Sequence, residues 1–541
     1  MQMTAPATQP KEGGISYKWI VAFVVIFGLF MTILDSTIVN IAIPRLQTAF
    51  GANLNDVQWV LTGYTLAQGV ATPLTGFLAD RIGTKRLYLI SLGIFTAGSA
   101  VCGLAWNLPI LIFFRVLQAM GGAFMSPLAI TLLYREFPVN ERGTAMGFLG
   151  IPILLAPAFG PTLGGYFVTF ADWQFIFYIN VPIGILAIVL GMLLLREAVI
   201  NARAQFDIPG FIFSATGLAA LLYALSDAST DGWGSVKVLG FMVTGILLLA
   251  IFVIIEIRVA HAGGQPLLDL RVFANAPFTT SSIASTLVTF ALFGGLFLIP
   301  IYLQNLRGLN AFQAGLLLLP QAFASMVAML AGGRLVDKIG VRAVVIPGLI
   351  LLAIVSWLYT SITLTMAFGA FQLLLILRSL ALGLCAQPLS VSALSEIPPR
   401  QLAQASSVST TLRFVASSLG TAVLATLVQS QTKVHYTHLA ERVTPDSALG
   451  QLIPQLQAAF VSHGASLTQA YGTAIASIYG MLQKQAYLLA MHDAFLLCAA
   501  LAIAATIAAI FVRYRRTPPA PSNSEEAAEA QQAREEAMLA V

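Results

Sequence analysis

A carboxylate inside an apolar stretch is the first residue of this sequence that suggests chemistry. Asp35 lies in a mostly apolar run from Trp19 to Pro44. At about 1.5 Å of rise per residue, a helix over this run would cross a bilayer and place Asp35 ~13 Å from the Pro44 end. An ionisable group at that depth is costly unless it is paired or protonated. Asp35 is therefore predicted to bind a proton or a substrate, and a permanent structural ion pair is the alternative.

Three polar residues accompany Asp35 on the same predicted helix. Thr32, Ser36 and Asn40 follow one another at intervals of four, which places them on one helical face. Polar side chains within a span usually face a cavity rather than lipid. We predict that these three residues line a substrate cavity.

A buried arginine is predicted at a similar depth. Arg115 falls in the apolar run 108–133, ~10 Å from the surface nearer to Asp35, so the two side chains could meet across a bundle. An arginine neighbour favours the ionised carboxylate, whereas burial disfavours it. A site balanced between these effects can release its proton when substrate or conformation changes the balance. A structural strut between two helices is the alternative. Gln118, one turn after Arg115, is a further cavity candidate.

Three other charged residues fall within apolar runs. Asp493 lies about seven residues into the last run, ~10 Å from its outer end, and is predicted to be a second proton-coupling group or part of a gate. A side chain reaching out to the surface is the alternative. Arg378, near the middle of its run, could attract an anionic substrate or pair with a carboxylate. Arg378 and Arg413 are both predicted to line the cavity, and a structural pairing is the alternative for Arg413.

The composition indicates a polytopic membrane protein. Of 541 residues, 58% are hydrophobic and only 9% are charged, so one soluble core could not bury the apolar surface. The net charge of +5 gives no reason to expect nucleic-acid binding. Cys102, Cys385 and Cys498 fall in apolar runs and suggest neither a disulfide framework nor a metal site. No nucleophile–base set and no phosphate-binding loop appears. We therefore expect neither an enzyme nor a cofactor, and an ion gradient as the energy source.

The apolar runs number about fourteen, so both termini are expected on one side of the membrane. Most Lys and Arg residues fall on that side, and only a few fall on the other. The positive-inside rule then places both termini in the cytoplasm. We expect the chain to lie in the inner membrane of a bacterial-type cell. The residues on the opposite side are Arg45, Lys237, Arg307, Lys433, Arg442 and Lys484.

An internal repeat divides the chain into two similar halves. GFLADRIGTKR at 76–86 recurs as GRLVDKIGVRA at 333–343, each after the second span of a six-span set. Parallel halves with a site between them are a transporter architecture that works by alternating access. The predicted parts are a cytoplasmic tail (1–17), a six-helix bundle (18–195), two inserted helices with loops (196–277), a second bundle (278–512) with an outward loop (431–485), and a cytoplasmic tail (513–541).

The repeated loop is predicted to act as a conformational latch. Gly76 permits close helix approach and Gly83 permits a sharp turn. Asp80 can pair with an arginine or cap a neighbouring helix N-terminus. The predicted latch residues are Gly76, Asp80, Arg81, Gly83 and Lys85 with their counterparts Asp337, Lys338, Gly340 and Arg342.

Three stretches resemble signatures of the major facilitator superfamily. Residues 76–87 match its cytoplasmic-loop motif, with Thr84 where arginine is usual, and RVLQAMGGAFMSP at 115–127 resembles its second motif, whose arginine is tied to proton coupling. APAFGPTLGG at 156–165 resembles the antiporter motif, although Ala156 replaces its first glycine. The resemblance assigns that motif to Pro157, Gly160, Pro161, Gly164 and Gly165.

Further matches narrow the resemblance to the fourteen-span drug/proton antiporter family. They are LDSTIVNIAIP at 34–44, WQFIFYINVPIG at 173–184 and TLRFVASSLGTA at 411–422; Gln174 stands where arginine is common, and Arg413 falls in the third. The resemblance implies an all-α major facilitator fold of about fourteen helices, with two six-helix bundles and two inserted central helices.

The resemblance also implies a proton-coupled exporter of lipophilic or amphiphilic drugs or toxic compounds. Few acids lie deep in the spans, so neutral, monocationic or amphiphilic substrates are expected in preference to dications. One alternative is an exporter of a native lipid, fatty acid or metabolite. Another is the inner-membrane permease of an envelope-spanning assembly that needs a periplasmic adaptor protein. The expected partners are otherwise a small-molecule substrate and the lipid bilayer.

The loop 431–485 and the tail 517–541 are the two long polar stretches. The loop is expected to hold short amphipathic helices lying on the membrane or over the pathway. Its residues His435, His438 and His463 are too dispersed to predict a metal site. The tail, rich in alanine and glutamate, is expected to be disordered or a marginal helix.

Overall fold

The computed structural model describes residues 16–52, 54–197, 206–262, 264, 266–398 and 401–512. Within these ranges the regular elements are helices, and no strand occurs. The predicted tails lie outside the described residues, apart from Ser16 and Tyr17.

Three sets of helices follow one another along the chain. The first half comprises α1 (Tyr17–Phe50), α2 (Leu54–Ala71), α3 (Leu74–Ile82), α4 (Thr84–Gly103), α5 (Leu108–Glu136), α6 (Arg142–Phe170), α7 (Phe175–Tyr178) and α8 (Asn180–Leu194). The inserted pair is α9 (Ile208–Asp231) and α10 (Val236–His261). The second half comprises α11 (Ala276–Ile301), α12 (Ala311–Ile339), α13 (Val341–Leu358), α14 (Phe368–Leu394), α15 (Leu402–Glu441), α16 (Ala448–Ser462) and α17 (Leu467–Ile510).

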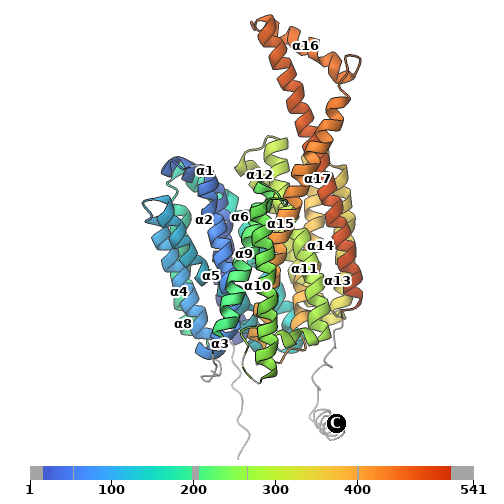
Figure 1. The fold of residues 1–541 in the computed structure, drawn as a ribbon. Coiled ribbons are helices and arrows are strands. Elements are labelled where there is room, and N and C mark those ends of the chain that lie inside the picture. The colour runs from blue at the N-terminus through green and yellow to red at the C-terminus, as the bar shows by residue number, and fades with distance from the viewer. Residues whose placement is uncertain are drawn as a thin grey trace, which may run out of the picture.

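Among the described residues, 12 helices are long and apolar enough to cross a membrane. Two further segments lie in the same bundle as these 12 helices: the consecutive helices α2 and α3, and helix α6 (Figure 1). Including these two, the arrangement agrees with the predicted all-α fold of about fourteen spans. α2 and α3 are separate because Pro73 lacks the backbone N–H that would continue the helix.

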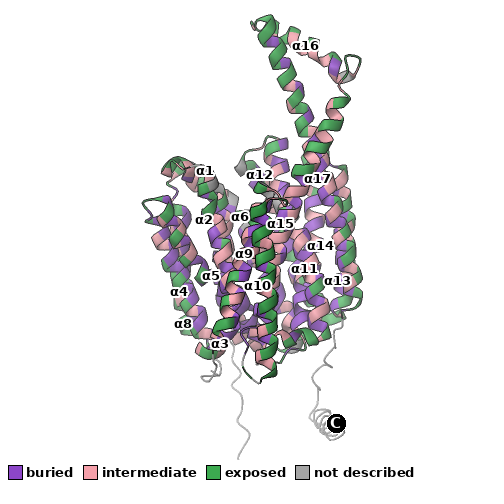
Figure 2. Ribbon diagram, in the orientation of Figure 1, coloured by how far each residue is buried: buried purple, intermediate pink, exposed green. Residues whose placement is uncertain are grey.

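The two halves stand side by side, with the inserted pair packed against both (Figure 1). α9 contacts α2 of the first half and α15 of the second. Trp59 stacks on Tyr223 with ring centroids 5.8 Å apart, and Trp233 donates a hydrogen bond to the Thr426 hydroxyl. The outer surface of α10 is exposed along its length (Figure 2), with Leu247 58% exposed, as expected for a lipid-facing helix.

Two faces of the bundle serve as references. The terminal face is the one at which α1 begins and α17 ends, and the distal face is the opposite one (Figure 1).

The predicted division at 277/278 falls two residues inside α11, which begins at Ala276. The domain boundaries stay a prediction.

The segment 431–485 forms a helical hairpin that projects from the distal face (Figure 1). α15 and α17 continue beyond the bundle as helices of 40 and 44 residues, and α16 crosses between their outer ends. The segment holds one short helix, as expected, but α16 lies at the outer end of the hairpin, and the rest of the segment continues the two long helices. The sequence from 430 to 441 contains no Gly or Pro that would end α15 at the membrane. No metal-binding cluster of three residues occurs in the described part of the chain, which includes the three hairpin histidines.

Candidate functional site

Asp35 lies at the centre of a buried polar network in the first half. Its side chain is fully buried, and Oδ2 accepts a hydrogen bond of 2.6 Å from Nη1 of Arg115. Its Oδ1 accepts from Nε2 of Gln118 at 3.1 Å and from Nδ2 of Asn180 at 2.9 Å. α1, α5 and α8 thus each contribute to one carboxylate. The structure brings together the predicted pair of Asp35 and Arg115.

Arg115 is fully buried in this network. Nη1 also donates to Oε1 of Gln118 at 2.8 Å, while Nη2 has no partner. The guanidinium carbon lies 4.0 Å from the centroid of the Tyr64 ring, which adds a cation–π contact. The arginine therefore has one ionic partner, Asp35, and its position depends on the charge of that carboxylate.

Sequence reasoning missed two members of the network. Asn180 bridges Asp35 to the Ser99 hydroxyl, which donates in turn to the carbonyl oxygen of Phe177. Asn180 falls within the stretch 173–184 that carried part of the family resemblance, so a signal existed. Ser99 gave none, because a serine in an apolar helix usually bonds its own backbone.

The predicted cavity residues of α1 make no hydrogen bond to Asp35 or Arg115 among the described contacts. Thr32 and Ser36 donate to carbonyl oxygens of their own helix, at 2.9 and 2.8 Å, and the exposed Asn40 does so at 3.2 Å. Gln118, by contrast, is fully buried and serves the Asp35 network. The three predicted cavity residues are therefore not part of the hydrogen-bond network of Asp35.

Asp493 lies apart from Asp35, in the second half at the base of the hairpin. Its Oδ2 lies 2.7 Å from Nε2 of His435, and its side chain is 39% exposed. The sequence did not predict this partner, because the two residues are separated by the whole hairpin. The position resembles an interfacial ion pair more than a deeply buried group.

The two remaining arginines of the predicted cavity have no carboxylate partner among the described ion pairs. Arg378 is 4% exposed, and its Nη2 donates to the carbonyl oxygens of Ala291 and Leu292 in α11. Arg413 is half-buried and donates to the Ser390 hydroxyl at 3.4 Å.

The two halves meet at the terminal face through Asp337. Its carboxylate accepts from the backbone N–H groups of Gly143 and Thr144, both at 2.9 Å, and from the Thr144 hydroxyl at 2.7 Å. These groups form the first turn of α6, where the helix dipole favours a negative charge. Asp337 therefore caps a helix of the opposite half.

Asp80, the counterpart of Asp337 in the internal repeat, makes a weaker contact with the opposite half. Asp80 accepts one hydrogen bond of 3.4 Å, from the Gln404 side chain of α15, and a Cβ on Gly76 would lie 2.9 Å from Cα of Gln404. Ser407 of α15 donates to the carbonyl oxygen of Thr72 at 2.8 Å.

Several predicted latch residues bond within their own half. Lys85 donates to carbonyl oxygens of Met192 and Leu195, and Glu197 accepts from the backbone N–H groups that open α4. Arg342 donates to the carbonyl oxygen of Val512. Gly83 and Gly340 have φ angles of 100° and 91°, which favour glycine, while Arg81 and Lys338 are exposed.

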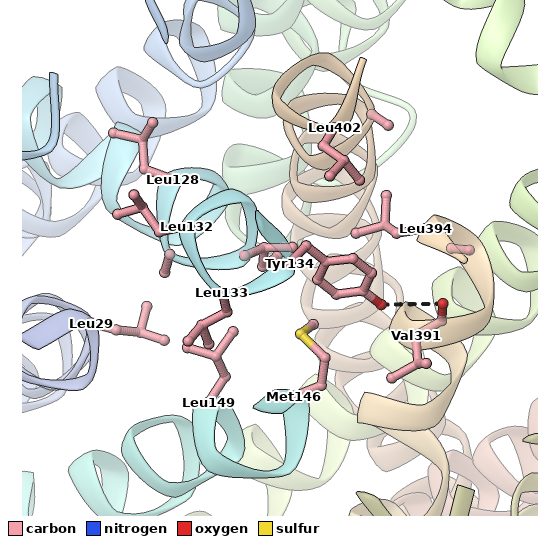
Figure 3. Close-up of a cluster of buried hydrophobic side chains, with 14 of the residues drawn as sticks. Leu29, Leu128, Leu132, Leu133, Tyr134, Met146, Leu149, Val391, Leu394 and Leu402 are labelled. Carbon is pink, nitrogen blue, oxygen red and sulfur yellow. Dashed lines mark hydrogen bonds between the residues drawn. The ribbon is translucent and has the colours of Figure 1, made fainter. Parts of the chain in front are cut away.

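A tyrosine completes the contact between the halves. The Tyr134 hydroxyl donates to the carbonyl oxygen of Val391 at 3.2 Å, within a buried apolar cluster that also contains Met146 and Leu402 (Figure 3). α6 and α12 approach so closely that a Cβ on Gly143 would lie 2.4 Å from the carbonyl oxygen of Gly333. The terminal face is therefore closed between the halves.

The antiporter-motif segment lies in the other end of α6, against α1. A Cβ on Gly160 would lie 2.3 Å from Oγ1 of Thr37, whereas one on Gly165 would meet nothing within 4 Å. Gly164 is buried. The side chains of Pro157 and Pro161 lie outside the described part of the structure. α6 thus contacts α12 near the terminal face and α1 further along.

Removing the charge of Asp337 is expected to open the terminal face. Hydrogen bonds to charged groups contribute about 1.5–3 kcal/mol each. In an Asp337→Asn protein, a cysteine placed at the buried Ser407 should therefore react at least about tenfold faster with an alkylating reagent. The matched control is Asp80→Asn, which alters one long hydrogen bond. Equal rates in the two variants would contradict this interpretation.

Comparison with known proteins agrees with this architecture. The sequence model of the Major Facilitator Superfamily matches residues 25–421. The uncharacterized MFS-type transporter YhcA of Bacillus subtilis (strain 168) is 34% identical over 507 residues, covering 93% of this chain and 94% of the relative. The multidrug export protein EmrB of Escherichia coli (strain K12) is 31% identical over 419 residues, covering 77% and 81%.

A solved structure supports the same fold. The crystal structure of the human organic anion transporter MFSD10 (TETRAN) matches with a TM-score of 0.57 at 16% identity, covering 91% of this chain and 100% of that chain. The family model covers well over half of the sequence, and the predicted superfamily is confirmed. The chain is therefore a multi-pass membrane protein that belongs to the major facilitator superfamily.

Proposed function

We propose that this protein is a proton-coupled exporter of amphiphilic small molecules that works by alternating access. The observation that carries the proposal is the fully buried pair of Asp35 and Arg115, 2.6 Å apart. A relative that is named a multidrug export protein and the antiporter-like motif in α6 support the direction of transport.

The network explains how one proton can change the state of this site. Ionised Asp35 accepts from Arg115, Gln118 and Asn180 at once. Protonation removes the charge that compensates Arg115 and turns one carboxylate oxygen into a donor. Gln118 and Asn180 must then rearrange, and Arg115 must find another partner. Proton binding is thereby linked to the relative positions of α1, α5 and α8.

The terminal face is proposed to be cytoplasmic. It carries basic residues of both halves, and positive charge is typical of cytoplasmic loops. With that face closed, the cavity would open outward, so the structure would represent the state that releases substrate and takes up a proton. Asp337 would stabilise this state by capping α6. The basic residues include Arg81, Lys85, Arg135, Arg142 and Arg334.

Purified protein in liposomes tests the proposal. With a pH gradient imposed across the membrane, an amphiphilic dye should move against the proton flux without any other protein. A stand-alone exporter needs no adaptor, so transport by the pure chain would also exclude the adaptor-dependent alternative. Absence of gradient-driven transport of every amphiphile tested would contradict the proposal.

Substrate charge gives a second test. The buried carboxylate Asp35 is already paired with Arg115, so the network has no free acid to compensate a dication. We expect monovalent dyes to compete for efflux more effectively than divalent dyes of similar size. Preference for divalent cations would show that other acids line the cavity, such as Asp493 or Asp227, which pairs with Lys237 in this structure.

A further inference from the structure

Arg378 is a buried arginine of the second half, as Arg115 is of the first, although the repeat register matches Arg115 with Gln372. Both lie on the fourth span of their half, α5 and α14, and both bond to the first span of that half, α1 and α11. The repeat register that matches Gly83 with Gly340 also matches Cys102 with Tyr359. Cys102 adjoins the Asp35 network, since its Sγ lies 3.7 Å from Oε1 of Gln118.

The two sites differ in charge. Arg115 meets a carboxylate, whereas Arg378 meets only two backbone carbonyl oxygens, at 2.9 and 3.3 Å. Where α1 supplies an acid, α11 supplies Gly295, on which a Cβ would lie 2.0 Å from Nη2 of Arg378. The guanidinium therefore packs directly on a bare helix backbone. No ion pair in the described part of the chain neutralises it.

Two side chains near Arg378 can donate a hydrogen bond, the Tyr359 hydroxyl and the Cys498 thiol. The hydrogen bonds of Arg378 use Nη2, which leaves Nε and Nη1 available. The Tyr359 hydroxyl is buried without a partner, and the ring stacks on Phe495 with centroids 4.5 Å apart. Tyr359 and Cys498 both lie within electrostatic range of the guanidinium. The site therefore offers N–H and O–H donors and a positive charge.

A cation in this position attracts a negative charge. Arginine stays protonated, so the site cannot become neutral by losing a proton. An unpaired charge inside a span is costly, and such residues usually mark a substrate or ion pathway. The planar fork of a guanidinium matches a carboxylate or a similar oxyanion.

We propose that Arg378 and Tyr359 form an anion-binding site in the second half, which takes one monovalent anionic group. Two sources share this chemistry: the anionic group of an exported amphiphile, or a free inorganic anion such as chloride. The first source deepens the proposed export function, on which it rests. The second does not depend on it.

Binding of a matched pair of probes to the purified protein tests the site. One probe is a fluorescent amphiphile that ends in a carboxylate, and the other is its uncharged methyl ester. Without chloride, with gluconate as the counter-ion, the wild type should bind the carboxylate at least about tenfold more tightly than the ester, as expected for one charge-assisted hydrogen bond. Arg378→Gln should bind both probes equally.

Two further variants keep the result interpretable if Arg378→Gln folds poorly. Arg378→Lys keeps the charge and should retain most of the preference. Tyr359→Phe removes only the hydroxyl and should reduce the preference about fivefold, as expected for the loss of one hydrogen bond. Equal affinity for both probes in the wild type without chloride, or an unchanged preference in Arg378→Gln, would overturn the proposal.

A chloride titration separates the two sources. If the site takes free anions, chloride should abolish the preference in the wild type and raise its melting temperature, but should not raise that of Arg378→Gln. If the site is reserved for a substrate group, chloride should have no effect while the preference remains. Binding is measured without a pH gradient, so failure of this site is distinguishable from failure of proton-coupled export.

Discussion

We expect Asp35→Asn to abolish transport driven by a pH gradient. Asparagine has nearly the shape of aspartate and can still accept from Gln118 and Asn180, so the protein should remain folded. It cannot bind and release a proton, and it leaves Arg115 without a compensating charge. Loss of one partner of a buried pair costs about 3–5 kcal/mol, so the melting temperature should fall as well. The measurement is uptake of an amphiphilic dye by proteoliposomes under an imposed pH gradient.

Asp493→Asn is the matched control for this variant. That carboxylate is 39% exposed and pairs with His435 near the distal face, so its neutralisation should leave most of the transport intact. In size-exclusion chromatography, elution of both variants at the same volume as the wild type would show that folding is retained. Undiminished transport by Asp35→Asn would move the proton-coupling site elsewhere, with Asp493 the next candidate.

Arg115→Ala is expected to shift the pH profile of transport upward or to collapse transport altogether. The variant removes the ionic partner of Asp35 but leaves that carboxylate buried among apolar residues. A buried carboxylate without a cationic partner favours its neutral form. The measurement is the initial rate of dye transport over a range of pH values at a constant pH difference.

Arg115→Lys is the control that separates the effect of the positive charge from the effect of the guanidinium geometry. Lysine restores the positive charge but lacks the planar fork that meets both Asp35 and Gln118, so we expect partial recovery. A wild-type pH profile in Arg115→Ala would instead indicate a structural strut between α1 and α5.

The centre of the site could be predicted because depth in a membrane can be read from position along a helix. Their positions along the chain predict similar depths for Asp35 and Arg115, and both are too costly to leave unpaired. The same reasoning could not identify Asn180 or Ser99, because an amide or hydroxyl in an apolar helix has several equally good partners. Those contacts depend on how α4 and α8 are rotated.

The contact between the halves was predictable in kind but not in detail. The repeated loop indicated that Asp80 or its counterpart would pair with an arginine or cap a helix. In the structure it is Asp337 that caps a helix, α6. Its partners are mostly backbone N–H groups, which no pattern of side chains in the sequence reveals. Glu197 likewise caps α4 with its carboxylate, and Lys85 bonds to backbone carbonyls within its own half.

The hairpin shows where hydropathy alone was insufficient. Apolar content ends the predicted spans near the membrane surface, but helix continuation depends on the absence of breaking residues. α15 and α17 therefore extend well beyond the bundle, and this extension brings His435 into contact with Asp493.

Proton release on substrate binding tests the central claim most directly. Purified protein in a weakly buffered solution near neutral pH is mixed with a saturating amphiphilic substrate, and released protons are measured with a pH-indicator dye. If Asp35 exchanges its proton for substrate, the wild type should release about one proton per molecule bound, as expected for a single titrating carboxyl group. Asp35→Asn should bind substrate and release none. Equal proton release by the wild type and Asp35→Asn would contradict the assignment of Asp35 as the coupling group.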